Sequence, residues 1–109
     1  MTFNEYQQAA RTTAQYPDLG KNVYYPTLGL VGEAGEVAEK IKKLMRDDHG
    51  TLTPERRQAL KKELGDVLWY VAALCSELGL EMGEVAELNV AKLRDRHDRG
   101  AIQGDGDNR

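Results

Sequence analysis

The chain has 109 residues, of which 40% are apolar and 30% charged, and 18 acidic residues outnumber 15 basic ones to give a net charge of −3. This composition indicates one globular domain and disfavours a nucleic-acid polymer as partner, because domains that bind one are usually basic. The longest apolar run, residues 67–75, is much shorter than the about 20 residues that span a membrane, so no membrane association is expected. The single cysteine, Cys75, excludes an internal disulfide and favours a cytoplasmic location.

Four helices are predicted in chain order, over residues 3–15, 26–46, 54–79 and 82–96. Thr2 and Glu5 have the spacing of a capping box at the start of the first helix, and Pro26 suits the first position of the second. No segment alternates polar and apolar residues over a useful length, so we expect an all-α fold that resembles a four-helix bundle. Residues 1–99 are predicted to form the domain and residues 100–109 a flexible C-terminal tail.

The second and third predicted helices repeat one pattern at an offset of 30 residues. Each has an apolar stripe with two acids along one margin, Glu33 and Glu36 in the second helix and Glu63 and Asp66 in the third. Packing of the two stripes brings all four carboxylates toward a common rim, where they repel one another. Mg²⁺ prefers oxygen ligands and removes this conflict, so the paired E-x-x-[ED] motifs indicate a Mg²⁺ site. A solvated helix flank is the alternative for either pair taken alone.

Three glycines interrupt these helices, and each costs about 1 kcal/mol relative to Ala in a helix interior. Close approach of another helix or of a ligand is the simplest compensation at Gly32, Gly35 and Gly65. A di-iron or di-manganese carboxylate site fits less well, because it uses Glu-x-x-His and no His follows any of the four acids at that spacing. Lys40, on the margin of Glu33, is either solvated with its basic neighbours or a salt-bridge partner of the acids.

The fourth predicted helix has a polar edge on which Asn89, Lys92 and Arg96 recur at helical spacing. An amide and two cations on one stripe suit phosphate oxygens, which arginine binds through two parallel hydrogen bonds. On this helix alone, Lys92 and Arg96 also suit a helix C-terminus, whose dipole favours cations. If the fourth helix lies beside the rim of four carboxylates and its Mg²⁺, phosphate binding becomes the preferred interpretation.

Three stretches, GLVGEAGEVAEKIKK, ELGDVLWYV and NVAKLRDR, resemble the MazG-like nucleoside triphosphate pyrophosphohydrolases, an all-α superfamily. Their signature, E-x-x-E followed by E-x-x-D, falls on Glu33, Glu36, Glu63 and Asp66. The resemblance implies that these acids bind Mg²⁺, with Mn²⁺ as a substitute, and carry catalysis through the metal. It also implies substrate contacts from Tyr70, Asn89, Lys92 and Arg96. No general base is assigned, because Gly32 stands where some members carry an additional acid.

The implied reaction is the hydrolysis of an NTP or dNTP at the α-phosphorus to a nucleoside monophosphate and pyrophosphate. Such a reaction removes a surplus or non-standard nucleotide from the cellular pool. The alternatives are a non-catalytic helical interaction module and a metal-dependent nucleotide-binding regulator. The small domain and the resemblance also imply a homodimer or homotetramer. Trp69, Ala72 and Ala73 make the third helix apolar nearly all round, which indicates either a central helix or a subunit interface, and the small domain favours the interface.

Overall fold

The computed structural model describes residues 1–109 and contains four helices and no strand: α1 (Phe3–Arg11), α2 (Tyr24–Asp47), α3 (Pro54–Glu77) and α4 (Met82–Asp98). The predicted all-α fold class is confirmed. The predicted capping box of Thr2 and Glu5 is present at the start of α1. None of the four helices combines the length and the apolarity that crossing a membrane requires.

The end of α1 and the start of α2 differ from the predicted ones. α1 ends at Arg11 rather than at residue 15, because the hydroxyls of the next two threonines donate to carbonyl groups of its last turn. α2 begins at Tyr24, where Oδ1 of Asn22 accepts hydrogen bonds from the N–H groups of Tyr24 and Tyr25, each at 3.1 Å. Pro26 therefore lies inside the first turn, where its missing N–H has no helical partner to lose.

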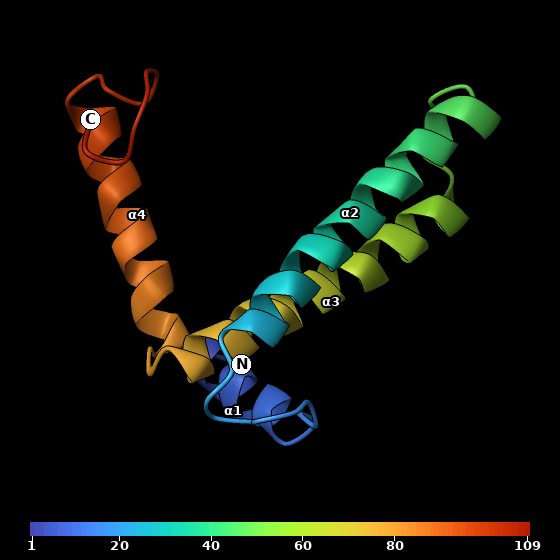
Figure 1. Cartoon of the computed structure of the whole chain (residues 1–109). Coiled ribbons are helices and arrows are strands. Elements are labelled where there is room, and N and C mark those ends of the chain that lie inside the picture. Colours follow the sequence, from blue (N-terminus) through green and yellow to red (C-terminus); the bar gives the residue numbers. More distant parts are fainter.

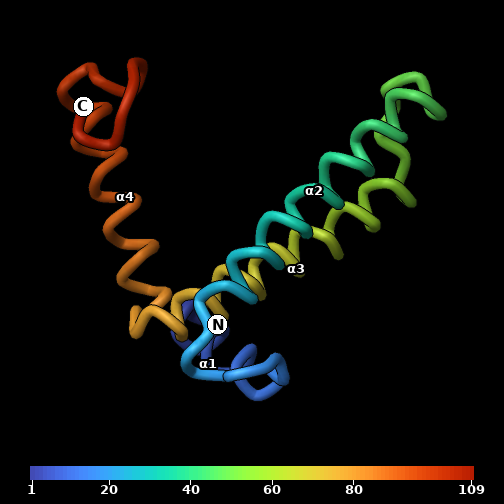
Figure 2. The backbone as a smooth tube through the Cα atoms, viewed as in Figure 1, coloured from blue at the N-terminus to red at the C-terminus, as the bar shows by residue number.

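The helices form two diverging arms that meet at a common base (Figure 1). α2 and α3 pack side by side as one arm, and α4 forms the other, while α1 packs on α3 and α4 at the base. The backbone trace in Figure 2 shows the last residues curling back at the far end of α4. The Cα radius of gyration is 16.7 Å, whereas a compact domain of this length has one of about 13 Å. The four-helix arrangement is therefore open within one chain.

The helix α3 lies between α1 and α2, which cover two of its faces. The indole N–H of Trp69 donates to Oγ1 of Thr13 at 2.9 Å, and Ala72 and Ala73 are buried against residues from the N-terminal segment. The expectation that this face of α3 forms a subunit interface is therefore wrong. The apolar residues on that face serve the packing of α1 within the same chain.

The start of α4 is fixed by side chains of α1. The N–H of Met82 donates to Oε1 of Gln7 at 2.8 Å, and the N–H of Gly83 donates to Oδ1 of Asn4 at 2.8 Å. The N-cap residue of α4, Glu81, provides no side-chain hydrogen bond, so α1 supplies the acceptors that the first free N–H groups need. The direction of the α4 arm is thus set by its contacts with α1.

Candidate metal and nucleotide site

Three carboxylates from facing positions of the α2–α3 arm converge. Glu33 of α2 and Glu63 and Asp66 of α3 each offer one carboxylate oxygen, and these oxygens lie within 4.8 Å of one another. Glu33 and Glu63 are half-buried, whereas Asp66 is exposed. We call these three residues the acid cluster. Its members come from the two repeated motifs, which the antiparallel packing of α2 on α3 brings together.

The electrostatics of the acid cluster favour a bound cation. Burial raises the pKa of the Glu33 carboxyl above its ordinary value, and the carboxylates of Asp66, Glu63 and Glu36 raise it further. Glu36, the fourth predicted acid, is exposed one turn after Glu33 and lies outside the group of oxygens that converge. A divalent cation relieves the repulsion among these groups, and carboxylate oxygens are the donors that Mg²⁺ prefers. The donor set therefore fits this metal.

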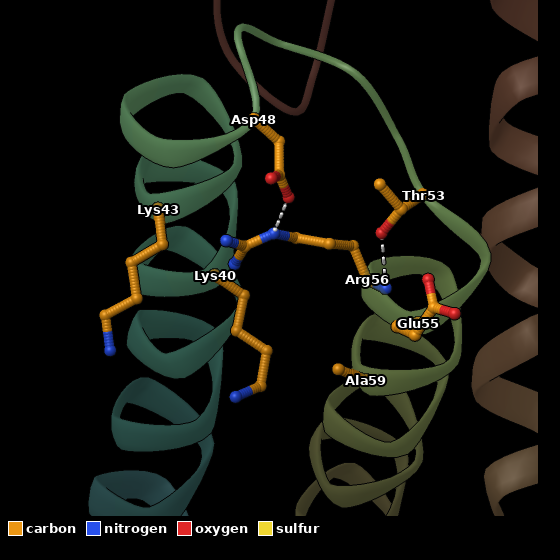
Figure 3. A pocket seen from close by; sticks show the side chains of 7 residues that line it. All are labelled: Lys40, Lys43, Asp48, Thr53, Glu55, Arg56 and Ala59. Atoms are coloured by element: carbon orange, nitrogen blue, oxygen red, sulfur yellow. Dashed lines mark hydrogen bonds and ion pairs between the residues drawn. The ribbon is translucent and has the colours of Figure 1, made fainter.

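Basic residues border the acid cluster on the side of the α2–α3 turn. Nζ of Lys40 lies 3.5 Å from a carboxylate oxygen of Glu63, which confirms the salt-bridge interpretation. Lys40 also lines a cavity of about 460 Å³ between the ends of the two helices (Figure 3), together with Lys43, Asp48, Thr53, Glu55, Arg56 and Ala59. The guanidinium of Arg56 is paired there, with Nε 2.5 Å from Oδ2 of Asp48. Its charge is thus already compensated within the chain.

Three tyrosine rings lie in a row on the opposite side of the acid cluster, toward the base of the arm. The rings of Tyr16 and Tyr25 stack with centroids 4.8 Å apart, and the centroids of Tyr25 and Tyr70 are 6.4 Å apart. Burial raises the pKa of the Tyr70 hydroxyl, and the proximity of Tyr25, Glu33 and Asp66 raises it further. Tyr70 therefore links this tyrosine row to the acid cluster.

A glycine that was not singled out in the sequence permits the close contact between α2 and α3. A Cβ atom at Gly29 would overlap the ring of Tyr70. At Gly32, Gly35 and Gly65, by contrast, a Cβ atom would meet no other atom within 4 Å. The expected close approach of a second helix at these three glycines does not occur within the chain. Ligand approach at these positions stays a prediction.

The predicted phosphate-binding residues lie on the α4 arm, and the chain does not bring them to the acid cluster (Figure 1). Asn89 is exposed there. Nζ of Lys92 lies 3.0 Å from a carboxylate oxygen of Asp107, and a guanidinium nitrogen of Arg96 lies 3.4 Å from the same oxygen. Arg96 is only 4% exposed and also donates to the backbone carbonyls of Gly106 and Asp107. Residues of the C-terminal segment thus occupy both cations.

Sequence reasoning missed Tyr16 and Tyr25 as possible components of the site. The signal for Tyr25 was available, because Tyr25, Gly29 and Glu33 recur at steps of four residues and lie on one face of α2. Tyr16 gave no such signal, since it precedes α2 in a connecting segment and reaches Tyr25 only through the path of that segment.

Comparison with known proteins places this arrangement in a family. The model of the MazG nucleotide pyrophosphohydrolase domain matches residues 26–101, which contain the acid cluster, and the chain belongs to this family. Gene 37 protein of Mycobacterium phage L5 is 51% identical over 109 residues, covering 95% of this chain and 96% of that protein. No solved structure matches the chain significantly.

Proposed function

We propose that the protein hydrolyses a nucleoside triphosphate, NTP or dNTP, at the α-phosphorus and releases a nucleoside monophosphate and pyrophosphate. The convergence of Glu33, Glu63 and Asp66 within 4.8 Å carries this proposal, together with membership of the MazG family. The cellular role is to clear surplus or non-standard nucleotides from the cytoplasmic pool.

The acid cluster and Glu36 would hold Mg²⁺, for which Mn²⁺ substitutes. When bound, this ion lowers the pKa of a water molecule and neutralises charge on the triphosphate. The carboxylates of the acid cluster repel phosphate, so phosphates can approach them only with the cation in between. The position of the cation would therefore fix the position of the phosphates. Most of the rate enhancement then comes from positioning and electrostatics rather than from covalent catalysis by a side chain.

The remaining contacts to substrate come from α3 and α4. Tyr70, half-buried beside the acid cluster, faces the nucleoside. Lys92 and Arg96 bind the phosphates and Asn89 the sugar or base. α4 points away from the acid cluster of its own chain. We therefore propose that these three residues bind a substrate that is held at the acid cluster of a partner subunit, in a homodimer or homotetramer.

The test is turnover of a panel of NTPs and dNTPs with Mg²⁺ and separate detection of pyrophosphate and orthophosphate. We expect pyrophosphate and monophosphate as products. Glu63→Gln and Asp66→Asn should each lower kcat/KM by about 100-fold or more, with helix content unchanged. Glu39→Gln is the matched control, because Glu39 lies on α2 outside the acid cluster and pairs with Lys42 instead.

The other outcomes identify the alternatives. Release of orthophosphate from the γ-position would contradict the reaction class. Mg²⁺-dependent protection by nucleotide against thermal unfolding, without turnover, would indicate a nucleotide-binding regulator. Absence of both turnover and protection would indicate a helical interaction module.

A further inference from the structure

A buried carboxylate outside the acid cluster organises the segment that connects α1 to α2. The side chain of Glu77, at the end of α3, has no exposed surface. Its Oε2 accepts hydrogen bonds from Arg11 at 2.7 Å, from the Tyr16 hydroxyl at 2.9 Å and from the N–H of Gly20 at 2.8 Å. Its Oε1 accepts one from the N–H of Asn22 at 2.6 Å. One carboxylate thus ties α3 to α1 and to three points of the connecting segment.

These hydrogen bonds outweigh the cost of burial. Burial alone raises the pKa of Glu77, but the donors, with the N–H of Asn22 first among them, hold it at about 2. Glu77 is therefore ionised throughout the physiological pH range. A permanent buried charge of this kind fixes its donors in place, because each of them would leave an uncompensated charge if it moved away.

The Glu77 network continues to Tyr25 by two routes. Asn22, whose N–H is held by Glu77, accepts hydrogen bonds from the N–H groups of Tyr24 and Tyr25 and so caps the start of α2. Tyr16, whose hydroxyl is held by Glu77, stacks on the ring of Tyr25 with an interplanar angle of 11°. The backbone and the ring of Tyr25 are therefore both positioned from Glu77.

Tyr25 presents a fixed but partly free aromatic surface near the acid cluster. It is 43% exposed, and its ring lies next to that of Tyr70, which adjoins Glu33 and Asp66. Tyr25 precedes Glu33 by eight residues on α2, a distance of about 12 Å along the helix. A nucleotide is long enough to span this distance, with its phosphates at one end and its base at the other.

We propose that the exposed part of Tyr25 packs against the nucleobase of the substrate, and that Glu77 is the positioning residue that holds Tyr25 for this contact. The inference rests on the proposed function, because it takes the substrate to be a nucleotide. Tyrosine contacts every base through its π-face, so this surface supplies affinity for bases in general. Glu77 itself touches no substrate.

The test compares ligands with and without a base, by calorimetric dissociation constants in the presence of Mg²⁺. The probes are the α,β-methylene analogues of ATP, CTP, GTP and UTP, and methyl triphosphate, which has the phosphates alone. Tyr25→Ala should weaken binding of all four analogues by about 10-fold or more, within the range known for base–aromatic stacking. Its effect on methyl triphosphate should stay below about 2-fold, and Tyr25→Phe should restore binding of the analogues.

Tyr24→Ala is the matched control, because Tyr24 is adjacent, 77% exposed and makes no aromatic contact. Glu77→Gln should reproduce the selective loss of Tyr25→Ala. Where Glu77→Gln does not fold, Asn22→Ala replaces it, since this change keeps the four hydrogen bonds to Glu77 and removes the cap that leads to Tyr25, together with one hydrogen bond from Asn22 to the Pro17 carbonyl. A structural role alone would lower thermal stability and leave the ratio of the two kinds of ligand unchanged.

Equal losses for the analogues and methyl triphosphate, or equal effects of Tyr24→Ala and Tyr25→Ala, would overturn this inference while turnover by the wild type still supported the proposed function. A selective loss without any turnover would support the base contact and refute hydrolysis. Absence of nucleotide binding to the wild type would refute both.

Discussion

In the acid cluster, burial and the neighbouring carboxylates both oppose ionisation of Glu33. Its raised pKa means that the folded chain binds this proton more tightly than the unfolded chain does. The ionised carboxylate therefore lowers the stability of the metal-free protein, and this loss develops as the pH rises above the ordinary value of 4.5. A cation bound among these carboxylates would remove this cost to the stability of the metal-free state.

We expect Glu33→Gln to raise the melting temperature of the metal-free protein at about pH 7, by about 2–4 °C if the relieved repulsion is about 0.5 kcal/mol. The gain should vanish near pH 4, where the wild-type carboxyl is protonated. Excess Mg²⁺ should stabilise the wild type and leave the variant nearly unchanged. Thermal unfolding followed by circular dichroism, with and without chelator, measures all three. A variant that is less stable than the wild type at neutral pH without metal would contradict this account.

Gly29 and Gly32 give opposite predictions although both lie inside α2. Ala at Gly29 would overlap the Tyr70 ring, so Gly29→Ala should lower the free energy of unfolding by about 1–2 kcal/mol, as overpacking usually does. Ala at Gly32 meets open space, so Gly32→Ala should raise it by up to about 1 kcal/mol. Urea denaturation measures both changes. In a Tyr70→Ala background the penalty at Gly29 should disappear, and its persistence there would show that the overlap is not its cause.

At the scale of the elements, the α2–α3 arm was predictable from the sequence because its information is local and repeated. The apolar stripes set which faces pack, and the spacing of Glu63 and Asp66 sets which side the acids take. The direction of α4 was not predictable in this way. It depends on Gln7 and Asn4, whose partners Met82 and Gly83 are more than 70 residues further along the chain. The pattern of residues within a single helix does not predict hydrogen bonds between residues so far apart in the sequence.

The same limit applies to the candidate site. The sequence predicted that Glu33, Glu36, Glu63 and Asp66 meet at one rim, since one turn separates acids that follow an apolar stripe, and all but Glu36 converge. It did not predict that Glu77 would collect donors from residues 11–22, because a lone acid after an apolar run resembles an ordinary helix end. Chain topology, and not local pattern, decides which backbone groups meet that carboxylate.

The C-terminal segment, residues 100–109, contacts the same cations of α4 that are proposed to bind phosphate. The Asp107 carboxylate lies against Lys92 and Arg96, and hydrogen bonds from both cations hold the pKa of Asp107 below its ordinary range. A phosphate that binds these cations must displace it. We expect Asp107→Asn to tighten the binding of inorganic pyrophosphate by about 2- to 5-fold, because the ion pair that pyrophosphate must displace is exposed and therefore weak.

Calorimetry with pyrophosphate at two salt concentrations measures the effect of Asp107→Asn, and the gain should shrink at high salt. Asp105→Asn is the control, because it removes the same charge from the same segment without an ion pair to α4. Equal effects of the two substitutions would attribute the change to net charge alone.

The molecule as a whole exposes more surface than a monomer of its mass should. Its accessible surface is 7988 Å², whereas a compact monomer of 12.2 kDa has about 6,100 Å². Large apolar side chains account for part of the excess on both arms, with Leu28 71% and Val31 67% exposed on α2 and Leu88 72% exposed on α4. Two chains together carry an excess of nearly 4,000 Å², which lies in the range that obligate dimers bury. This excess leads us to expect that the open fold is that of a subunit in an oligomer.

We expect the wild type to sediment as a dimer or tetramer, and Leu88→Glu or Val31→Glu to shift it toward the monomer by placing a charge in an apolar contact. Thr51→Glu adds the same charge at the exposed turn between α2 and α3 and should leave the assembly intact. Because Lys92 and Arg96 lie on the arm that points away from the acids, the monomeric variants should also lose turnover although their acid cluster is unchanged. Sedimentation equilibrium and pyrophosphate release on the same samples measure the two effects together. A monomeric wild type with full activity would show that α4 reaches the acids within one chain, and the apolar surfaces of α2 and α4 would then face each other across the two arms.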